Sequence, residues 1–138
     1  MTSSEFQGVD ASWLAVDSIG QVAVFTTGGE GPIPISALPS ARDAEEMLQS
    51  LEKISECTLL VDVPRPDDFI AFARQGLFSY DWRDVHRTKR EAVERYELQA
   101  IPLRPAAAEQ LPEKIRLLAE ATNLDSVVFG ATYVDLSV

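Results

Sequence analysis

Alternating apolar positions near the start of the chain predict a β-hairpin. Two short runs of β-forming residues, 13–17 and 21–26, flank a tight turn that ends in Gly20. This arrangement is a common sequence signature of two paired strands. In the second run both alternate faces carry apolar residues, such as Val24 on one face and Phe25 on the other. We therefore expect the hairpin to lie inside the fold.

A loop and two helices are predicted to follow the hairpin. Three glycines and two prolines prevent residues 27–34 from continuing the strand. Apolar residues recur at helical spacing over 41–56, and Ser40 precedes them as a predicted N-cap. Residues 66–75 begin with a proline and two acids, which favour a helix start, and Gly76 favours its end.

The middle of the chain predicts three strands. The apolar run 58–63 is typical of a short buried strand. Residues 77–82 and 92–101 alternate in the manner of strands, and we expect them to pair around the basic stretch 83–90. A competing interpretation makes residues 84–96 a helix, because so many of them are charged.

The end of the chain completes an α+β pattern. Residues 112–121 predict a helix with Asn123 as its C-terminal cap, and residues 126–135 predict a strand broken at Gly130. The resulting order, ββ-α-β-α-β-β-α-β, favours a mixed or mainly antiparallel sheet with about three helices packed on it. We expect one domain over residues 12–138, preceded by a flexible start at residues 1–11.

Composition favours an ordinary folded protein of the cytoplasm. The chain has 138 residues, of which 46% are hydrophobic and 25% charged, as in globular domains. Residues 1–11 contain no basic and apolar regions of a secretory signal, and no apolar run approaches the roughly 18 residues of a membrane span. The lone Cys57 fits a reducing compartment. We expect no membrane association.

The charge is uneven and indicates a class of partner. The net charge is -10, and residues 1–68 hold 12 acids and 3 bases, a net of -9. An acidic surface repels nucleic acid and attracts a basic protein. The alternative explanation is that acidity only maintains solubility.

Two groups of residues are candidates for partner binding. The first consists of acids in the loop and in the first two helices: Glu30, Asp43, Glu45, Glu46, Asp67 and Asp68. The second is a segment dense in polar, aromatic and titratable groups: Tyr80, Asp81, Trp82, Asp84 and His86. Tyr and Trp are among the residues that most often dominate binding energy. The alternative for this segment is a hairpin in which Trp82 packs inward and the charged residues pair in solvent.

The chain carries no complete catalytic or metal-binding motif. The loop 27–34 lacks the Lys-Ser/Thr ending of a phosphate-binding loop. His86 and Cys57 are too few for a zinc site, and carboxylates at the spacing of a calcium loop are absent. Cys57 directly precedes an apolar run, where cysteine usually packs as a small core residue instead of acting as a nucleophile. We predict no cofactor, no metal and no catalytic residue.

The N-terminal motifs also carry a family resemblance. Residues 13–17 (WLAVD), followed by 20–25 (GQVAVF) and 28–32 (GGEGP), resemble the opening of small uncharacterised bacterial proteins, some of which look like immunity proteins of polymorphic toxin systems. The resemblance covers about the first quarter of the chain. It implies a small cytosolic protein that binds a toxin domain and blocks it, with no chemistry of its own.

Three functional hypotheses follow. The first is a non-enzymatic protein-binding domain, an acidic inhibitor of a basic toxin or enzyme. The second is a small enzyme or ligand-binding protein with a pocket between the Gly-rich loop and residues 80–86, where Asp81, Asp84 and His86 would act as acid and base groups. The third is a self-associating subunit whose contact face is Phe78, Tyr80 and Trp82 on an exposed strand. The sequence leaves the oligomeric state open.

Overall fold

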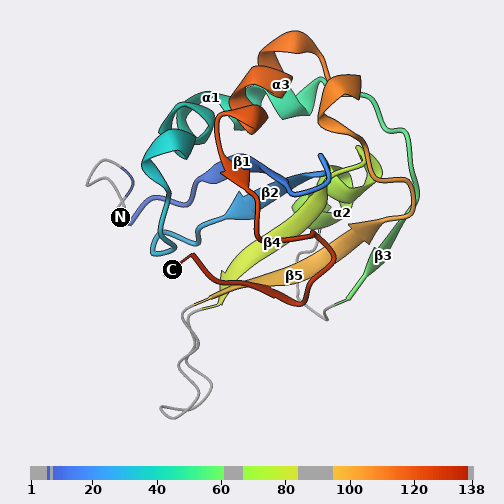
Figure 1. Ribbon diagram of the computed structural model, residues 1–138. Helices are drawn as coiled ribbons and strands as arrows, with labels where there is room; N and C mark the ends of the chain where they lie inside the picture. The colour runs from blue at the N-terminus through green and yellow to red at the C-terminus, as the bar shows by residue number, and fades with distance from the viewer. Residues whose placement is uncertain (1–5, 7, 61–66, 84–94, 137–138) are drawn as a thin grey trace.

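The computed structural model describes residues 6, 8–60, 67–83 and 95–136, and it has a mixed sheet of seven strands with three helices (Figure 1). The strands are β1 (Ser12–Asp17), β2 (Val22–Thr26), β3 (Cys57–Leu59), β4 (Phe78–Arg83), β5 (Arg95–Pro102), β6 (Asn123–Leu124) and β7 (Tyr133–Val134). The helices are α1 (Leu38–Gln49), α2 (Asp67–Arg74) and α3 (Glu113–Glu120), with short 3-10 turns η2 (Ile35–Ala37) and η4 (Ala108–Gln110). The predicted α+β class is confirmed.

The predicted hairpin is confirmed as β1 and β2, which are both inner strands of the sheet. The strand order is β3-β5-β4-β2-β1-β6. The short strand β7 also pairs with β5, at Tyr96 and Glu97. β1 and β2 are antiparallel, whereas β4 joins β2 in parallel and β5 returns antiparallel to β4. The expected pairing of the strands at 77–82 and 92–101 is therefore confirmed for the described residues.

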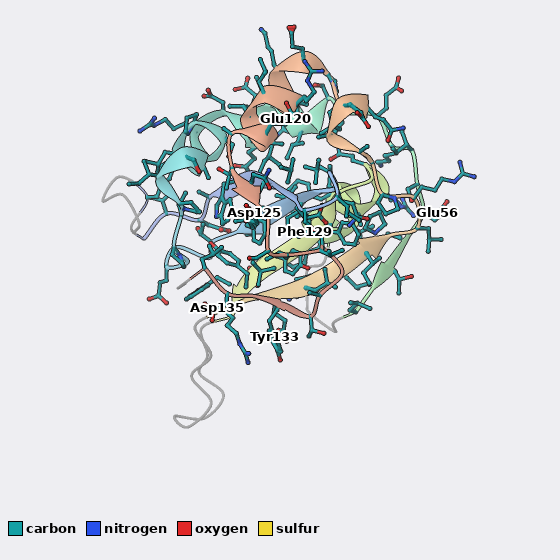
Figure 2. All side chains as sticks on the ribbon, in the orientation of Figure 1. Glu56, Glu120, Asp125, Phe129, Tyr133 and Asp135 are labelled. Carbon is teal, nitrogen blue, oxygen red and sulfur yellow. The ribbon has the colours of Figure 1, made fainter. Side chains whose placement is uncertain are left out.

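Both faces of the sheet are covered, as the apolar residues on both sides of β2 predict. On one face the helices bury a cluster that includes Val24, Leu48 and Ile115. On the other face an aromatic cluster around Phe25 is covered by the C-terminal segment, which crosses the strands in red in Figure 1. Figure 2 shows Phe129 of this segment over the sheet. The helix-covered face is the one that carries the candidate site.

The first helix differs from its prediction at both ends. It begins at Leu38, with Pro39 in its first turn, where the missing N–H and fixed φ of proline cost nothing. Ser40 is therefore not the N-cap: its Oγ lies inside the helix, accepts a bond from Leu14 N (3.0 Å) and donates to Ala37 O (2.9 Å). The helix ends at Gln49 instead of residue 56, because the N–H groups of residues 54 and 55 donate to Arg74 O of α2.

Two predicted strands are also shorter than expected. The segment 58–63 is not a buried strand in its described part, because β3 lies at the sheet edge, pairs with β5 and leaves Leu60 exposed. Residues 61–63 lie outside the described residues. Of the segment 126–135, only Tyr133–Val134 form a strand, β7, whereas residues 126–132 form turns and irregular structure, in which Phe129 N donates to Asp17 Oδ2. Asn123 lies in β6 and is not a helix cap.

The remaining predictions fall partly outside the described residues. Helices at 66–75 and 112–121 are confirmed as α2 and α3, and Gly76 has a φ of 89° just after α2. Of residues 84–96, Arg95 and Tyr96 lie in β5, and residues 84–94 are outside the described part. In the segment predicted to be flexible, Phe6 is buried and Gly8 N donates to Gly29 O (2.8 Å), so packing begins before residue 12.

Candidate functional site

A groove between α1 and α2 gathers acidic side chains from four separate segments of the chain. Its volume is about 530 Å³, and its carboxylates come from Asp10, Glu45, Asp68 and Asp81. Lys53 is the one cationic side chain among its described lining residues. The groove therefore gathers negative charge along one hollow, where the neighbouring carboxylates reinforce the local potential.

The floor of the groove is a row of polar residues at one end of the sheet. The strand registers place Ser12 opposite Thr26 and Thr26 opposite Asp81, on the face that the helices cover. The hydroxyl oxygens of Ser12 and Thr26 lie 3.5 Å apart. Side chains two residues apart on a strand point to the same face, so Ser12 shares its face with Leu14, and Thr26 shares its face with Val24. Leu14 and Val24 are buried apolar residues, and the polar row therefore lies at the edge of the apolar cluster.

Helical spacing builds the two walls. Glu45 and Gln49 lie one turn apart on α1. Asp68 and Phe72 lie one turn apart on α2, and Gln75 follows three residues later, just after the helix ends. Gln75 joins the walls at one end, because its Nε2 donates to Leu48 O (2.6 Å) and to Leu51 O (3.1 Å). The groove is thus fixed by hydrogen bonds between the two helical segments.

The structure brings together three of the acids predicted from sequence. Glu45, Asp68 and Asp81 line the groove, although they belong to different elements. The other predicted acids, Glu30, Asp43, Glu46 and Asp67, do not line the groove, although they are exposed like Glu45 and Asp68. Sequence reasoning missed Asp10, because it lies in the segment taken to be flexible, and it missed the hydroxyls of the floor.

The aromatic residues of the second candidate group lie in or against the core. Tyr80 is fully buried, and its hydroxyl donates to Ala131 O (2.7 Å). Trp82 is partly buried, with its ring 5.1 Å from that of Tyr96. The expectation that Phe78, Tyr80 and Trp82 lie on an exposed strand is wrong, because β4 is an inner strand of the sheet. Asp84 and His86 lie outside the described residues.

The Gly-rich loop is anchored to the aromatic core through Tyr96. Trp13 Nε1 donates to the Tyr96 hydroxyl (3.1 Å), and that hydroxyl donates to Pro32 O (3.0 Å). On the other side, Gly28 N donates to Asp10 Oδ1 (2.9 Å). The loop therefore lies between the core and the N-terminal segment, and it helps to place Asp10 at the groove.

Burial of the two core tyrosines predicts sensitivity to alkali. Burial raises the pKa of Tyr80 from 10.0 to about 12, and it also raises the pKa of Tyr96. The folded protein then keeps these protons at pH values where the unfolded chain loses them, so stability is lost as pH rises above about 10. We expect Tyr80 alone to cost on the order of 1 kcal/mol by pH 11. Urea unfolding between pH 8 and 11 measures this slope, and the same slope in Tyr80→Phe would contradict the assignment.

The described residues offer no metal centre and no membrane span. They contain no cluster of three or more His, Cys, Asp or Glu side chains that could hold a metal ion. Cys57 is half-buried on β3, and His86 lies outside the described residues. None of the described helices is long and apolar enough to cross a membrane.

The fold and groove define an α+β protein with an acidic cleft between two helices that pack on one face of a mixed sheet. Comparison with family models, with curated proteins and with solved structures found no match for the chain.

Proposed function

We propose that the protein is a non-enzymatic binding domain that uses the groove between α1 and α2 to hold basic side chains of a partner protein. One observation carries this proposal: four carboxylates from distant parts of the chain line one hollow, and Lys53 is the one cation among the lining residues that the structure describes. Opposite charge on a partner would speed encounter and fix its orientation.

The size and floor of the groove favour arginine as the inserted residue. A volume of about 530 Å³ accommodates a few side chains of a partner rather than a whole structural element. A guanidinium group donates up to five hydrogen bonds in a planar fork and pairs well with carboxylates. The hydroxyls of Ser12 and Thr26 add neutral acceptors beside Asp81.

The narrower proposal is a cytoplasmic inhibitor of a basic toxin or enzyme, as the resemblance to immunity proteins implies. The net charge of -10 supports it. The residues that carry the resemblance, such as Trp13 and Pro32, take part in the anchoring of the loop. In this chain these residues therefore have a structural role, and the acids proposed to contact the partner lie elsewhere, in the groove.

Neutralising the groove acids should slow association with a basic probe. The test variant combines Asp10→Asn, Glu45→Gln, Asp68→Asn and Asp81→Asn. A fluorescent nonaarginine peptide serves as the probe, and stopped-flow anisotropy at low salt gives the association rate. We expect a decrease of roughly tenfold or more, because steering by focused charge accelerates association by 10- to 1,000-fold.

A matched variant separates the groove from overall charge. Asp43→Asn, Glu46→Gln, Asp67→Asn and Glu109→Gln remove the same charge at exposed positions outside the groove. We expect this control to slow association much less than the groove variant does. Equal rates for the two variants would show that only net charge acts, and the groove proposal would then be abandoned.

A further inference from the structure

The strand β3 forms one edge of the sheet and directs backbone groups away from it (Figure 1). Within the described part of the chain, β3 pairs with β5 and with no other strand. Leu60 N donates to Gln99 O (2.8 Å), and bonded positions alternate with unbonded ones in an antiparallel pair. Cys57 and Leu59 therefore point their N–H and C=O groups outward, where no other described residue bonds to them.

This edge can accept one more strand. The residues that alternate with the outward ones, Thr58 and Leu60, are exposed. The strand carries neither the proline nor the lysine that natural edge strands often use to prevent pairing. Because β3 has only three residues, backbone bonds alone would hold a partner weakly. A second contact is therefore needed to select the partner.

A basic hollow at the start of β3 provides that contact. Its volume is about 550 Å³, and its cations, Lys53, Arg74 and Arg104, come from three separate segments of the chain. Glu56 is the one carboxylate among its described lining residues. This balance is the reverse of that in the whole chain, which has 12 basic and 22 acidic side chains. The hollow is therefore a local positive region on an acidic protein.

Hydrogen bonds of Ser55 hold the segments of the hollow together, and its cations are weakly engaged. Ser55 N donates to Arg74 O (3.0 Å), and Ser55 Oγ accepts a bond from Arg104 N (2.8 Å). The ion pair of Arg74 with Glu56 is long, at 4.0 Å, and both side chains are largely exposed, so it contributes little. Lys53 and Arg104 form no ion pair with the residues that the structure describes. Carboxylates of a partner would find these cations available.

We propose that the edge of β3 binds an extended acidic segment of a partner protein, which runs antiparallel to β3 and ends with its acidic residues in the basic hollow. Addition of a strand to a sheet edge is a common mode of peptide recognition, and antiparallel pairing is slightly the more stable kind. In this direction the C-terminal end of the added segment lies beside the start of β3. Leu103, which is 63% exposed, offers it an apolar contact in the same hollow.

The charges favour such a segment over a second copy of this chain. A copy that paired through the same edge would bring Glu56 as the one acid of its described segment 56–60. The proposal does not depend on the function of the acidic groove, because that groove repels an acidic segment and takes the opposite charge.

The probe is the peptide acetyl-Thr-Val-Thr-Val-Asp-Glu-amide, whose β-forming residues precede two acids. Titration of the ¹⁵N-labelled protein should shift the amide signals of Cys57 and Leu59 most. A peptide that ends in Asn-Gln should bind roughly fivefold more weakly, as expected for the loss of exposed ion pairs. A peptide N-methylated at its central residues cannot donate to the edge and should bind at least about tenfold more weakly. Equal affinity for the probe and either control would overturn the proposal.

Two variants at one position test the edge from the side of the protein. Leu59→Pro removes an outward donor that the pairing with β5 does not use, and should weaken binding of the probe at least about tenfold. Leu59→Ala trims the same side chain but keeps the N–H group, and should bind the probe as the unmodified protein does. If Leu59→Pro does not fold, the N-methylated peptide tests the same bonds. Sedimentation velocity completes the test, because self-association that Leu59→Pro abolishes would mean that the edge pairs with a second copy instead.

Discussion

Replacing Asp17 with alanine should lower the free energy of unfolding by about 3–5 kcal/mol, which is a large fraction of the stability of a domain of this size. Asp17 is 2% exposed, and its carboxylate joins the hairpin turn to the C-terminal segment. Oδ1 accepts bonds from the N–H groups of Ile19 (3.1 Å) and Gln21 (2.8 Å). Oδ2 accepts bonds from Gln21 Nε2 and from Phe129 N, both at 2.8 Å. Alanine would leave several of these donors without an acceptor.

Urea unfolding measures this loss of stability. Two further variants show whether the loss comes from the hydrogen bonds of the Asp17 carboxylate. Asp17→Asn keeps one acceptor oxygen and should lose about half as much stability. Asp125→Ala removes an exposed carboxylate from the turn that follows β6, labelled in Figure 2, and should change stability by less than about 0.5 kcal/mol. A loss below about 1 kcal/mol in Asp17→Ala would mean that the carboxylate is not what holds the two segments together.

Local sequence patterns predict the elements of this fold better than they predict where each element ends. Alternation identified β1 and β2 because their apolar residues face two covered sides. Ser40 was misplaced because serine suits an N-cap, whereas here its hydroxyl also bonds to Leu14 N across 26 residues. The end of α1 was missed for the same reason, since the bonds that replace its last turns come from Arg74 of α2.

The candidate site was only partly predictable. The sequence shows which residues are acidic, but Glu45, Asp68 and Asp81 come together only because α1 and α2 pack on the same face of the sheet. The parallel pairing of β2 with β4, which places Asp81 beside Thr26, is a long-range feature that no local motif encodes. The aromatic residues beside Asp81 were predicted as contacts because Tyr and Trp are common in interfaces, and here the core uses Tyr80 instead.

Gly31→Ala should cost about 3 kcal/mol, at the upper end of the range for overpacking a core. A Cβ atom at this buried position would lie 2.5 Å from Tyr96 Oη, 2.9 Å from Tyr96 Cζ and 3.0 Å from Trp82 Cβ. The tyrosine ring cannot move aside easily, since its hydroxyl is bonded to Trp13 Nε1 and to Pro32 O. The glycine is therefore required by the close approach of the loop to the aromatic core.

A double-mutant cycle with Tyr96→Phe tests whether this contact causes the loss. Removal of the hydroxyl deletes the atom nearest to the new methyl group, so Gly31→Ala should cost at least about 1 kcal/mol less in the phenylalanine background. Tyr96→Phe alone should also destabilise the protein, because Trp13 Nε1 then loses its acceptor. If the losses of stability in the two single variants simply add in the double variant, the destabilisation by Gly31→Ala arises from another part of the loop. Non-additive losses would show that the Gly-Glu-Gly-Pro motif is coupled to Trp13 and the core through the Tyr96 hydroxyl group.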